Sequence, residues 1–183
     1  MKKIFILFIF LLPNSFALGS VKENIIKNLI STQNLIFNFE QNINGKIETG
    51  NCIIEYPKKI FCNYNLKNEK KLVSNGKILV IKNKYGSYYR YPIKKTPLDY
   101  ILDKKFLIKE IGNLEERIID DKYINFTFFK EENEINIFFD KDSFNLIGWQ
   151  TLDIYQNINI TYLSSIKKNQ ILKKNIFQLP LAN

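Results

Sequence analysis

The sequence predicts a mainly β domain of the α+β class, built on a curved antiparallel sheet. Apolar and polar residues alternate with a period of two over much of the chain after residue 35, as they do on strands with one buried face. Turn signals separate these stretches, and Asn75-Gly76 is the strongest because both residue types tolerate a positive φ. Two short stretches, 20–31 and 96–102, carry the signals of helices instead.

The first helix is predicted over residues 20–31. Ser20 can cap its start, and Glu23 stands three positions later, as in a capping box. The apolar residues that follow recur at helical spacing: Val21, Ile25, Ile26, Leu29 and Ile30. An amphipathic helix of this kind covers one side of a sheet.

Strands follow this helix. Residues 35–43 place Leu35, Phe37, Phe39, Gln41 and Ile43 on one face. The same alternation returns in 60–66 and 78–81, and an aromatic strand over 88–91 ends at Pro92.

A short helix is predicted from Thr96-Pro97, with Thr96 as its cap and Pro97 in its first turn. Leu98, Ile101 and Leu102 share one side of it. A helix this short is not stable alone, so it must rest on an apolar surface.

The second half predicts a meander of strands that bends into a curved sheet or barrel. Trp149 is interpreted as packing, and Asp120-Asp121 as a turn, because adjacent strand residues point to opposite faces. The strands are expected at 124–128, 135–139, 152–154 and 158–162, with turns at 131–133, 141–145 and 156–157.

The length of 183 residues and a hydrophobic content of 45% predict one domain, residues 18–183. Residues 1–17 are interpreted as a signal peptide: Lys2 and Lys3 precede the apolar run 4–12, and Ser15-Phe16-Ala17 offers small residues for cleavage. A membrane anchor is disfavoured because Pro13 and Asn14 interrupt the run. The mature protein is therefore expected in the periplasm.

The net charge is +9, or +7 without Lys2 and Lys3, which could suggest nucleic acid as a partner. That function class is disfavoured. All of the 27 basic residues except Arg90 and Arg117 are lysine, which is typical of a solvated exterior, and an exported protein seldom meets nucleic acid.

The two cysteines, Cys52 and Cys62, flank Pro57 almost symmetrically. If residues 46–56 and 60–66 form a hairpin, the thiols could face each other and close a disulfide in an oxidising compartment. A register slip of one residue would instead place them on opposite faces, so the sequence leaves both states open. A metal site is not expected, because the chain has no histidine to complete the shell.

Catalysis has little support in the sequence, and no cofactor is expected. The chain has no histidine to act as a base, no G-x-S-x-G motif and no glycine-rich phosphate loop among its seven glycines. A binding protein is therefore favoured over an enzyme.

Several motifs resemble one family in order and spacing across the whole mature chain. They are Phe39-x-Gln41, Gly50 followed seven residues later by Pro57, LVSNGK (72–77), RYP (90–92), TPLDYIL (96–102) and FQLP (177–180). This series is similar to the outer-membrane lipoprotein carrier protein (LolA) family.

The resemblance implies an unclosed antiparallel β-barrel, or half-barrel, whose apolar concave face is covered by a lid of short helices. It also implies a monomeric periplasmic carrier of acylated lipoproteins. Its partners would be an inner-membrane ABC transporter that releases lipoproteins and an outer-membrane lipoprotein receptor. The alternative is a sensor module of the same fold that detects lipid or mislocalised lipoprotein. A sensor would usually carry a second domain or a membrane segment. The sequence predicts neither of these, which favours the carrier.

Alternation, read together with this resemblance, predicts which residues line the acyl cavity, although an aromatic strand face is also typical of an ordinary core. The predicted lining comprises Phe37, Phe39, Ile60, Tyr64, Leu79, Ile81, Tyr89, Tyr91, Leu98, Ile101, Phe126, Phe128, Ile137 and Phe139.

The chain departs from the family at Phe61. The resemblance implies an arginine at this position that hydrogen-bonds to the lid and holds it shut, but the sequence has phenylalanine. The lid would then be held by packing alone or by a different polar contact.

Overall fold

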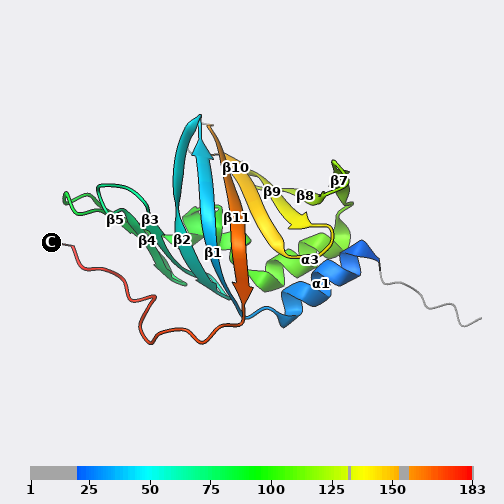
Figure 1. Cartoon of the computed structure of the whole chain (residues 1–183), viewed down its shortest axis with the longest axis horizontal. Coiled ribbons are helices and arrows are strands. Elements are labelled where there is room, and N and C mark those ends of the chain that lie inside the picture. Colours follow the sequence, from blue (N-terminus) through cyan, green and yellow to red (C-terminus); the bar gives the residue numbers. More distant parts are fainter. Residues whose placement is uncertain (1–19, 132, 153–156, 183) are drawn as a thin grey trace, which may run out of the picture.

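The computed structural model describes residues 20–131, 133–152 and 157–182, which form one curved antiparallel sheet with helices on one face (Figure 1). The strand order is β6-β5-β4-β3-β2-β1-β11-β10-β9-β8-β7. Strands β6 and β7 are its two edges and do not pair with each other, so the sheet is not closed. The predicted mainly β, unclosed antiparallel architecture is confirmed.

The elements follow the order of the chain. The helices are α1 (Val21–Ser31), the 3-10 turn η1 (Ile93–Lys95), α2 (Leu98–Ile101) and α3 (Lys104–Asn113). The strands are β1 (Asn34–Ile43), β2 (Lys46–Glu55), β3 (Lys59–Tyr64), β4 (Lys71–Asn75), β5 (Ile78–Lys82), β6 (Tyr88–Pro92), β7 (Arg117–Ile119), β8 (Tyr123–Lys130), β9 (Asn133–Asp140), β10 (Leu146–Leu152) and β11 (Ile158–Lys168).

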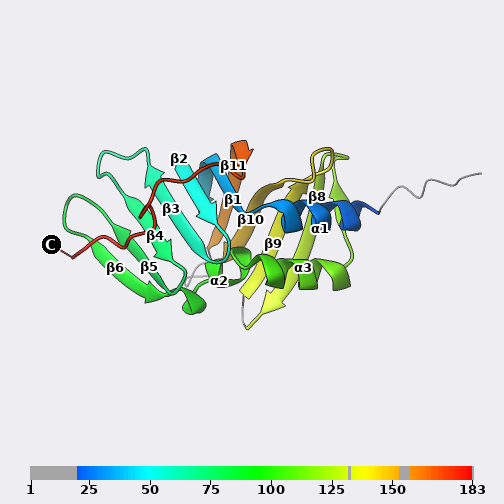
Figure 2. The same ribbon diagram turned by 90° about the horizontal axis from the view of Figure 1, so that it is seen from below.

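Three helices lie against the concave face of the sheet. Helices α1 and α3 run side by side beneath the half that contains β8 to β10, and α2 sits nearer the middle (Figure 2). Strands β3 to β6 extend beyond the helices as a wing whose outer edge is β6. The C-terminal segment returns along this wing, where the Tyr88 hydroxyl donates to the Pro180 carbonyl at 3.3 Å.

Helix α1 starts as predicted. The Ser20 hydroxyl accepts a hydrogen bond from the Glu23 backbone N–H, and the Glu23 carboxylate accepts one from the Ser20 N–H, both at 3.2 Å. Ile25 and Leu29 are its buried residues and face the sheet.

The predicted hairpin turn at Asn75-Gly76 joins β4 to β5. Gly76 has a φ of +94°, and the Asn75 side chain accepts from the N–H groups of Lys77 and Ile78, each at 3.0 Å. Asp120 and Asp121 also form a turn, with φ of 51° and 54°.

Helix α2 begins where the sequence indicates, but the predicted cap is wrong. The Thr96 hydroxyl donates to the Ile93 carbonyl at 2.8 Å, and Pro97 occupies the N-cap position without a side-chain hydrogen bond. The preceding 3-10 turn places an acceptor within reach of Thr96, which therefore closes η1 instead of opening α2.

Helix α3 is absent from the sequence prediction. Asp103 caps it by accepting a hydrogen bond from the Phe106 N–H at 3.1 Å, and Leu107 and Ile111 are buried on one side. The signal that could have found it is an aspartate followed by apolar residues at positions four and eight.

The strand expected at 152–154 begins earlier, since β10 spans Leu146–Leu152. Ile154 lies outside the described residues, as does the predicted signal peptide at 1–17. Trp149 is 7% exposed and belongs to the core cluster, as the packing interpretation requires. Among the helices that the structure describes, none combines the length and apolar run needed to cross a membrane.

Candidate functional site

The candidate site is the apolar concave face that the helices cover. Strand pairing brings the alternating apolar residues into rows across the sheet: Phe37 lies opposite Cys52, and Phe126 lies opposite Ile137. The helices close this face with their own buried residues, which are Ile25, Leu29, Ile101, Leu102, Leu107 and Ile111.

The structure places the predicted cavity residues on this same face. Tyr64 and Leu98 pack partly buried against its core cluster, and Ile81 is half-buried nearby. Nine are buried in one cluster: Phe37, Phe39, Ile60, Leu79, Ile101, Phe126, Phe128, Ile137 and Phe139. The alternation therefore identifies a common apolar face, and the assignment of these residues to acyl binding stays a prediction.

Tyr89 and Tyr91 differ from the rest of the predicted set. They pair with Ile81 and Leu79 on the same face but are 53% and 43% exposed. The reason is that β6 lies on the wing, beyond the cover of the helices (Figure 2). The apolar face thus continues past the lid to an open edge.

The space under the helices is occupied by the protein's own side chains. The Phe106 ring of α3 packs edge-on against Phe128 of β8, with ring centroids 5.4 Å apart, and Tyr100 of α2 packs against Phe106 at 5.1 Å. The structure is therefore a closed form. A hydrocarbon chain could reach the covered part of this face only if α2 and α3 moved away from the sheet.

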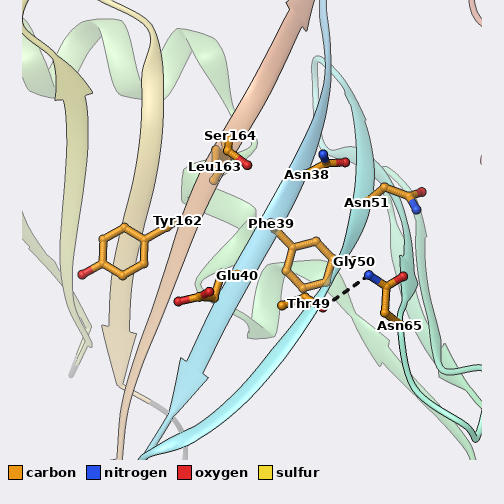
Figure 3. Close-up of a pocket in the computed structure, with 10 residues that line it drawn as sticks. All are labelled: Asn38, Phe39, Glu40, Thr49, Gly50, Asn51, Asn65, Tyr162, Leu163 and Ser164. Atoms are coloured by element: carbon orange, nitrogen blue, oxygen red, sulfur yellow. Dashed lines mark hydrogen bonds between the residues drawn. The ribbon is translucent and has the colours of Figure 1, made fainter.

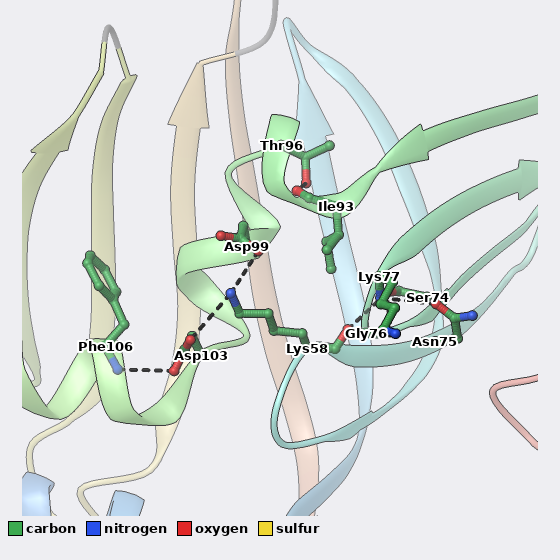
Figure 4. Close-up of polar contacts among 10 residues, drawn as sticks. All are labelled: Lys58, Ser74, Asn75, Gly76, Lys77, Ile93, Thr96, Asp99, Asp103 and Phe106. Atoms are coloured by element: carbon green, nitrogen blue, oxygen red, sulfur yellow. Dashed lines mark hydrogen bonds and ion pairs between the residues drawn. The ribbon is translucent and has the colours of Figure 1, made fainter.

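Lys58 ties the helices to the sheet (Figure 4). Its ammonium group lies 2.8 Å from the Asp99 carboxylate on α2 and 3.4 Å from that of Asp103, which also caps α3. The Lys58 backbone N–H donates to the Leu102 carbonyl at 2.8 Å. Its own carbonyl accepts from the Ser74 hydroxyl at 2.9 Å, which fixes the turn to β4.

The charge state of Lys58 supports this contact. Partial burial by itself would lower its pKa, but the hydrogen bonds and charges of Asp99 and Asp103 outweigh that effect and raise the pKa above the usual lysine value. The residue is therefore a cation under ordinary conditions.

Phe61 does not contact the lid. It pairs with Val73, in the row that faces away from the helices. Of the two alternatives left by the sequence, the structure shows a different polar contact, made by Lys58 on the turn between β2 and β3.

Helix α1 is held independently of Lys58. The Asn28 side chain donates to the Ser143 carbonyl at 2.9 Å and accepts from Lys168 of β11 at 3.2 Å. The Lys104 ammonium of α3 donates to the Ile30 and Thr32 carbonyls, at 3.1 and 2.8 Å. Helix α1 is thus bonded directly to the sheet side, whereas α2 relies on the Lys58 turn.

Cys52 and Cys62 lie directly opposite each other on β2 and β3 and are joined by a disulfide, with Cα atoms 4.1 Å apart. Both residues are buried in the core cluster. The hairpin register therefore places the two thiols on one face.

A polar cluster ends the apolar face near the β1–β2 turn. Glu48 is 4% exposed and pairs with Lys70 and, at 2.9 Å, with Lys46. The Lys70 ammonium lies 3.9 Å from the centre of the Tyr64 ring, and the Tyr64 hydroxyl donates to Gln41 at 3.3 Å. Burial raises the pKa of Tyr64, which is therefore neutral and available as a donor.

Two surface depressions lie away from the apolar face. One, of about 530 Å³, crosses β11, β1 and β2 on the outer side and is lined mainly by polar side chains, among them Asn38, Glu40 and Asn51 (Figure 3). The other, of about 680 Å³, lies between residues 172–178 and the ends of β2 to β4. Only Phe39 of the predicted cavity residues borders either one, so neither is the predicted acyl cavity.

Comparison with protein families gives one match. The family described as "Outer membrane lipoprotein carrier protein LolA" matches residues 31–180. No curated protein matches the chain.

Several solved structures are similar to this chain at low sequence identity. MucB is 10% identical, with a TM-score of 0.50, over 90% of this chain and 65% of its own. A LolA superfamily protein of Nitrosomonas europaea is 9% identical, with a TM-score of 0.47, over 87% and 96% of the two chains. A Vibrio parahaemolyticus domain described as an outer membrane lipoprotein-sorting protein is 8% identical, with a TM-score of 0.47, over 87% and 97%.

Proposed function

Because this chain belongs to the outer membrane lipoprotein carrier protein (LolA) family, we propose that it carries lipoproteins through the periplasm. The acyl chains of the cargo bind against the concave face after α2 and α3 move aside. Residues 1–17 direct export as a signal peptide. The protein acts as a binding protein, not as an enzyme.

One observation carries the proposal: the apolar face is continuous, and the helix above its middle, α2, is short and joined to the sheet only through the Lys58 turn among the polar contacts of the residues that the structure describes. Helix α2 is a single turn, Leu98–Ile101, and it is held by the Lys58 turn and by burial of Ile101. A short helix is not stable by itself, so such a cover can detach without unfolding the sheet.

The energetics explain why a carrier is needed. Burying one methylene is worth about 0.8 kcal/mol, so an acyl chain of about 15 methylenes in water costs on the order of 12 kcal/mol. Release of a lipoprotein from a membrane into water without a carrier is therefore negligible. After the cargo is released, the helices pack on the concave face again, so the empty protein does not expose this apolar surface.

The proposed partners follow from this role. The protein receives its cargo from an inner-membrane ABC transporter that releases lipoproteins, and it delivers the cargo to a receptor at the outer membrane. It works as a monomer, because a single concave face is enough to shield acyl chains.

Native mass spectrometry of the protein purified from the periplasm tests the proposal. We expect a fraction of the protein to carry an added mass equal to that of acylated lipoproteins. In cells whose lipoproteins lack the lipidation cysteine, this added mass should disappear. Co-purification of an unacylated protein alone would contradict the carrier role and would support the sensor role instead.

A further inference from the structure

The wing carries a concentrated positive charge. Residues 71–98 contain seven lysines and arginines and neither aspartate nor glutamate. The basic residues are Lys71, Lys77, Lys82, Lys84, Arg90, Lys94 and Lys95. Residues 103–142 have the opposite balance, with eleven acidic and seven basic residues. The charge of the protein is therefore divided along the sheet, and the positive end is the wing.

Exposed cations and tyrosines lie along the outer edge of the wing, with Tyr89 and Tyr91 on the concave face of β6 and Arg90 on its other face. We call this edge the β6 rim and define it as Lys84, Tyr85, Tyr89, Arg90, Tyr91, Lys94 and Lys95, all of which are exposed. Tyr85 is 72% exposed at the turn between β5 and β6.

Most of these charges are available to a partner. Lys84 pairs with Glu69 at 3.2 Å, whereas Arg90, Lys94 and Lys95 have no ion-pair partner among the residues that the structure describes. Strand β6 lies at the opposite end of the sheet from α1 and α3, so these two helices do not cover the rim (Figure 2).

The rim is continuous with the apolar face. Across the sheet, Tyr91 pairs with Leu79 and Tyr89 pairs with Ile81, and both of these partners lie on the concave side. A path of apolar and aromatic side chains therefore runs from beneath the helices to an edge that is rich in cations.

We propose that the β6 rim docks the protein on an anionic lipid surface. Lysine and arginine next to acidic lipid headgroups contribute attraction through the surface potential of the membrane. Tyrosine side chains suit the boundary between headgroups and acyl chains, because the ring is apolar and the hydroxyl is polar. The use of this edge as an entry for acyl chains rests on the proposed carrier function, but the contact with lipid does not.

Two features argue against strand addition by a protein partner at the same edge. Arg90 lies in the middle of β6, and Pro92 at its end has no N–H to donate. Charged residues and proline are the features by which edge strands avoid pairing with other strands.

Vesicle flotation tests the proposal with the full mature chain. The rim variant combines Arg90→Gln, Lys94→Gln and Lys95→Gln. The matched control combines Lys105→Gln, Lys109→Gln and Lys122→Gln, which removes three exposed cations from the opposite half. The vesicles are rich in phosphatidylglycerol or made of phosphatidylcholine alone.

We expect the wild type and the control to bind the phosphatidylglycerol vesicles at low salt and not the phosphatidylcholine vesicles. The rim variant should bind on the order of 100-fold more weakly, because it lacks three surface cations. High salt should abolish binding, because it screens the charges. Equal binding of rim variant and control would overturn the proposal. No binding of the wild type to these vesicles at low salt would also overturn the proposal.

A second measurement separates this proposal from the carrier role. Binding of an acylated lipopeptide in solution, without vesicles, should be the same in the rim variant and in the wild type. A rim variant that loses both vesicle and lipopeptide binding would overturn the rim as a separate docking surface. The wild type could instead bind vesicles through the rim and bind no lipopeptide. That result would refute the carrier role and leave the rim proposal standing.

Discussion

The Lys58 ammonium lies 2.8 Å from the Asp99 carboxylate and joins the turn between β2 and β3 to helix α2. The side chains of the two residues are 26% and 17% exposed, so the pair is partly shielded from water. Charge-assisted hydrogen bonds in such places contribute more than ion pairs at the surface. In the proposed carrier, this contact therefore sets how easily helix α2 separates from the sheet.

Replacing Lys58 tests that role. Lys58→Met removes the bonds to Asp99 and Asp103, which should lower the opening free energy of α2 by about 2 kcal/mol and speed its amide exchange roughly 30-fold. Hydrogen exchange over residues 98–102 measures this. The control is Lys59→Met, which breaks the more exposed pair with Glu55 and a contact with the Phe177 ring, neither of which involves α2. Equal exchange in the two variants would show that the ammonium group of Lys58 does not hold α2.

Tyr56 is the described residue with a buried side-chain oxygen that has no hydrogen-bond partner. Because an unpaired buried hydroxyl costs free energy, Tyr56→Phe should raise the free energy of unfolding by about 1 kcal/mol. The control is Tyr64→Phe, which should lower it by a similar amount because the Tyr64 hydroxyl donates to Gln41. Urea denaturation compares the two. A loss of stability in both would mean that Tyr56 has a partner in solution.

Glu48 gives the protein a defined response to acid. Burial by itself would raise its pKa, but the hydrogen bonds and charges of Lys70 and Lys46 outweigh burial and lower the pKa below 4.5. Its contribution to stability is therefore complete above pH 4.5 and is lost as the pH falls through the lower folded value.

Glu48→Gln should accordingly cost about 2 kcal/mol of unfolding free energy at pH 7. The difference from the wild type should shrink below pH 4.5, as followed by denaturation at several pH values. Glu69→Gln, in a more exposed pair with Lys84, should change little at any pH. A difference between Glu48→Gln and the wild type that persists unchanged in acid would contradict this assignment.

Gly50 allows the Phe39 ring to lie against β2. A Cβ atom at Gly50 would come 2.6 Å from that ring and would also collide with the Asn63 carbonyl. Gly50→Ala should therefore lower the free energy of unfolding by about 3 kcal/mol. Gly112→Ala should instead raise it by up to about 1 kcal/mol, because this position in α3 has open space and alanine favours the helix. Thermal unfolding distinguishes the two, and a Gly50→Ala protein as stable as the wild type would contradict the packing.

Local signals account for the parts of the fold that the sequence predicts. The capping box of Ser20 and Glu23, the turn at Gly76 and the alternation in β1 and β8 each act within a few residues. Helix α3 was missed because it is stabilised by tertiary packing: it lies on α1, which is distant in the chain, and its Phe106 ring packs on Phe128 of β8. Propensity alone does not reveal such a helix.

The attachment of the lid could not be predicted for the same reason. Lys58 and Asp99 are 41 residues apart, and the contact depends on a turn that directs Lys58 toward α2. The sequence likewise gives no sign that Tyr89 and Tyr91 lie outside the cover. Their exposure depends on where the helices end, and alternation along a strand does not carry that information.

Site-specific photo-crosslinking tests the binding of acyl chains to the concave face most directly. A benzoylphenylalanine is placed at Phe128, which is 4% exposed on the concave side, or at its neighbour Phe129, which is 67% exposed on the outer side. With a triacylated lipopeptide, we predict crosslinks to the acyl chains at position 128 and none at position 129. The same peptide without acyl chains should give none at either. Crosslinking at 129 but not at 128, or equal crosslinking at both, would contradict the account.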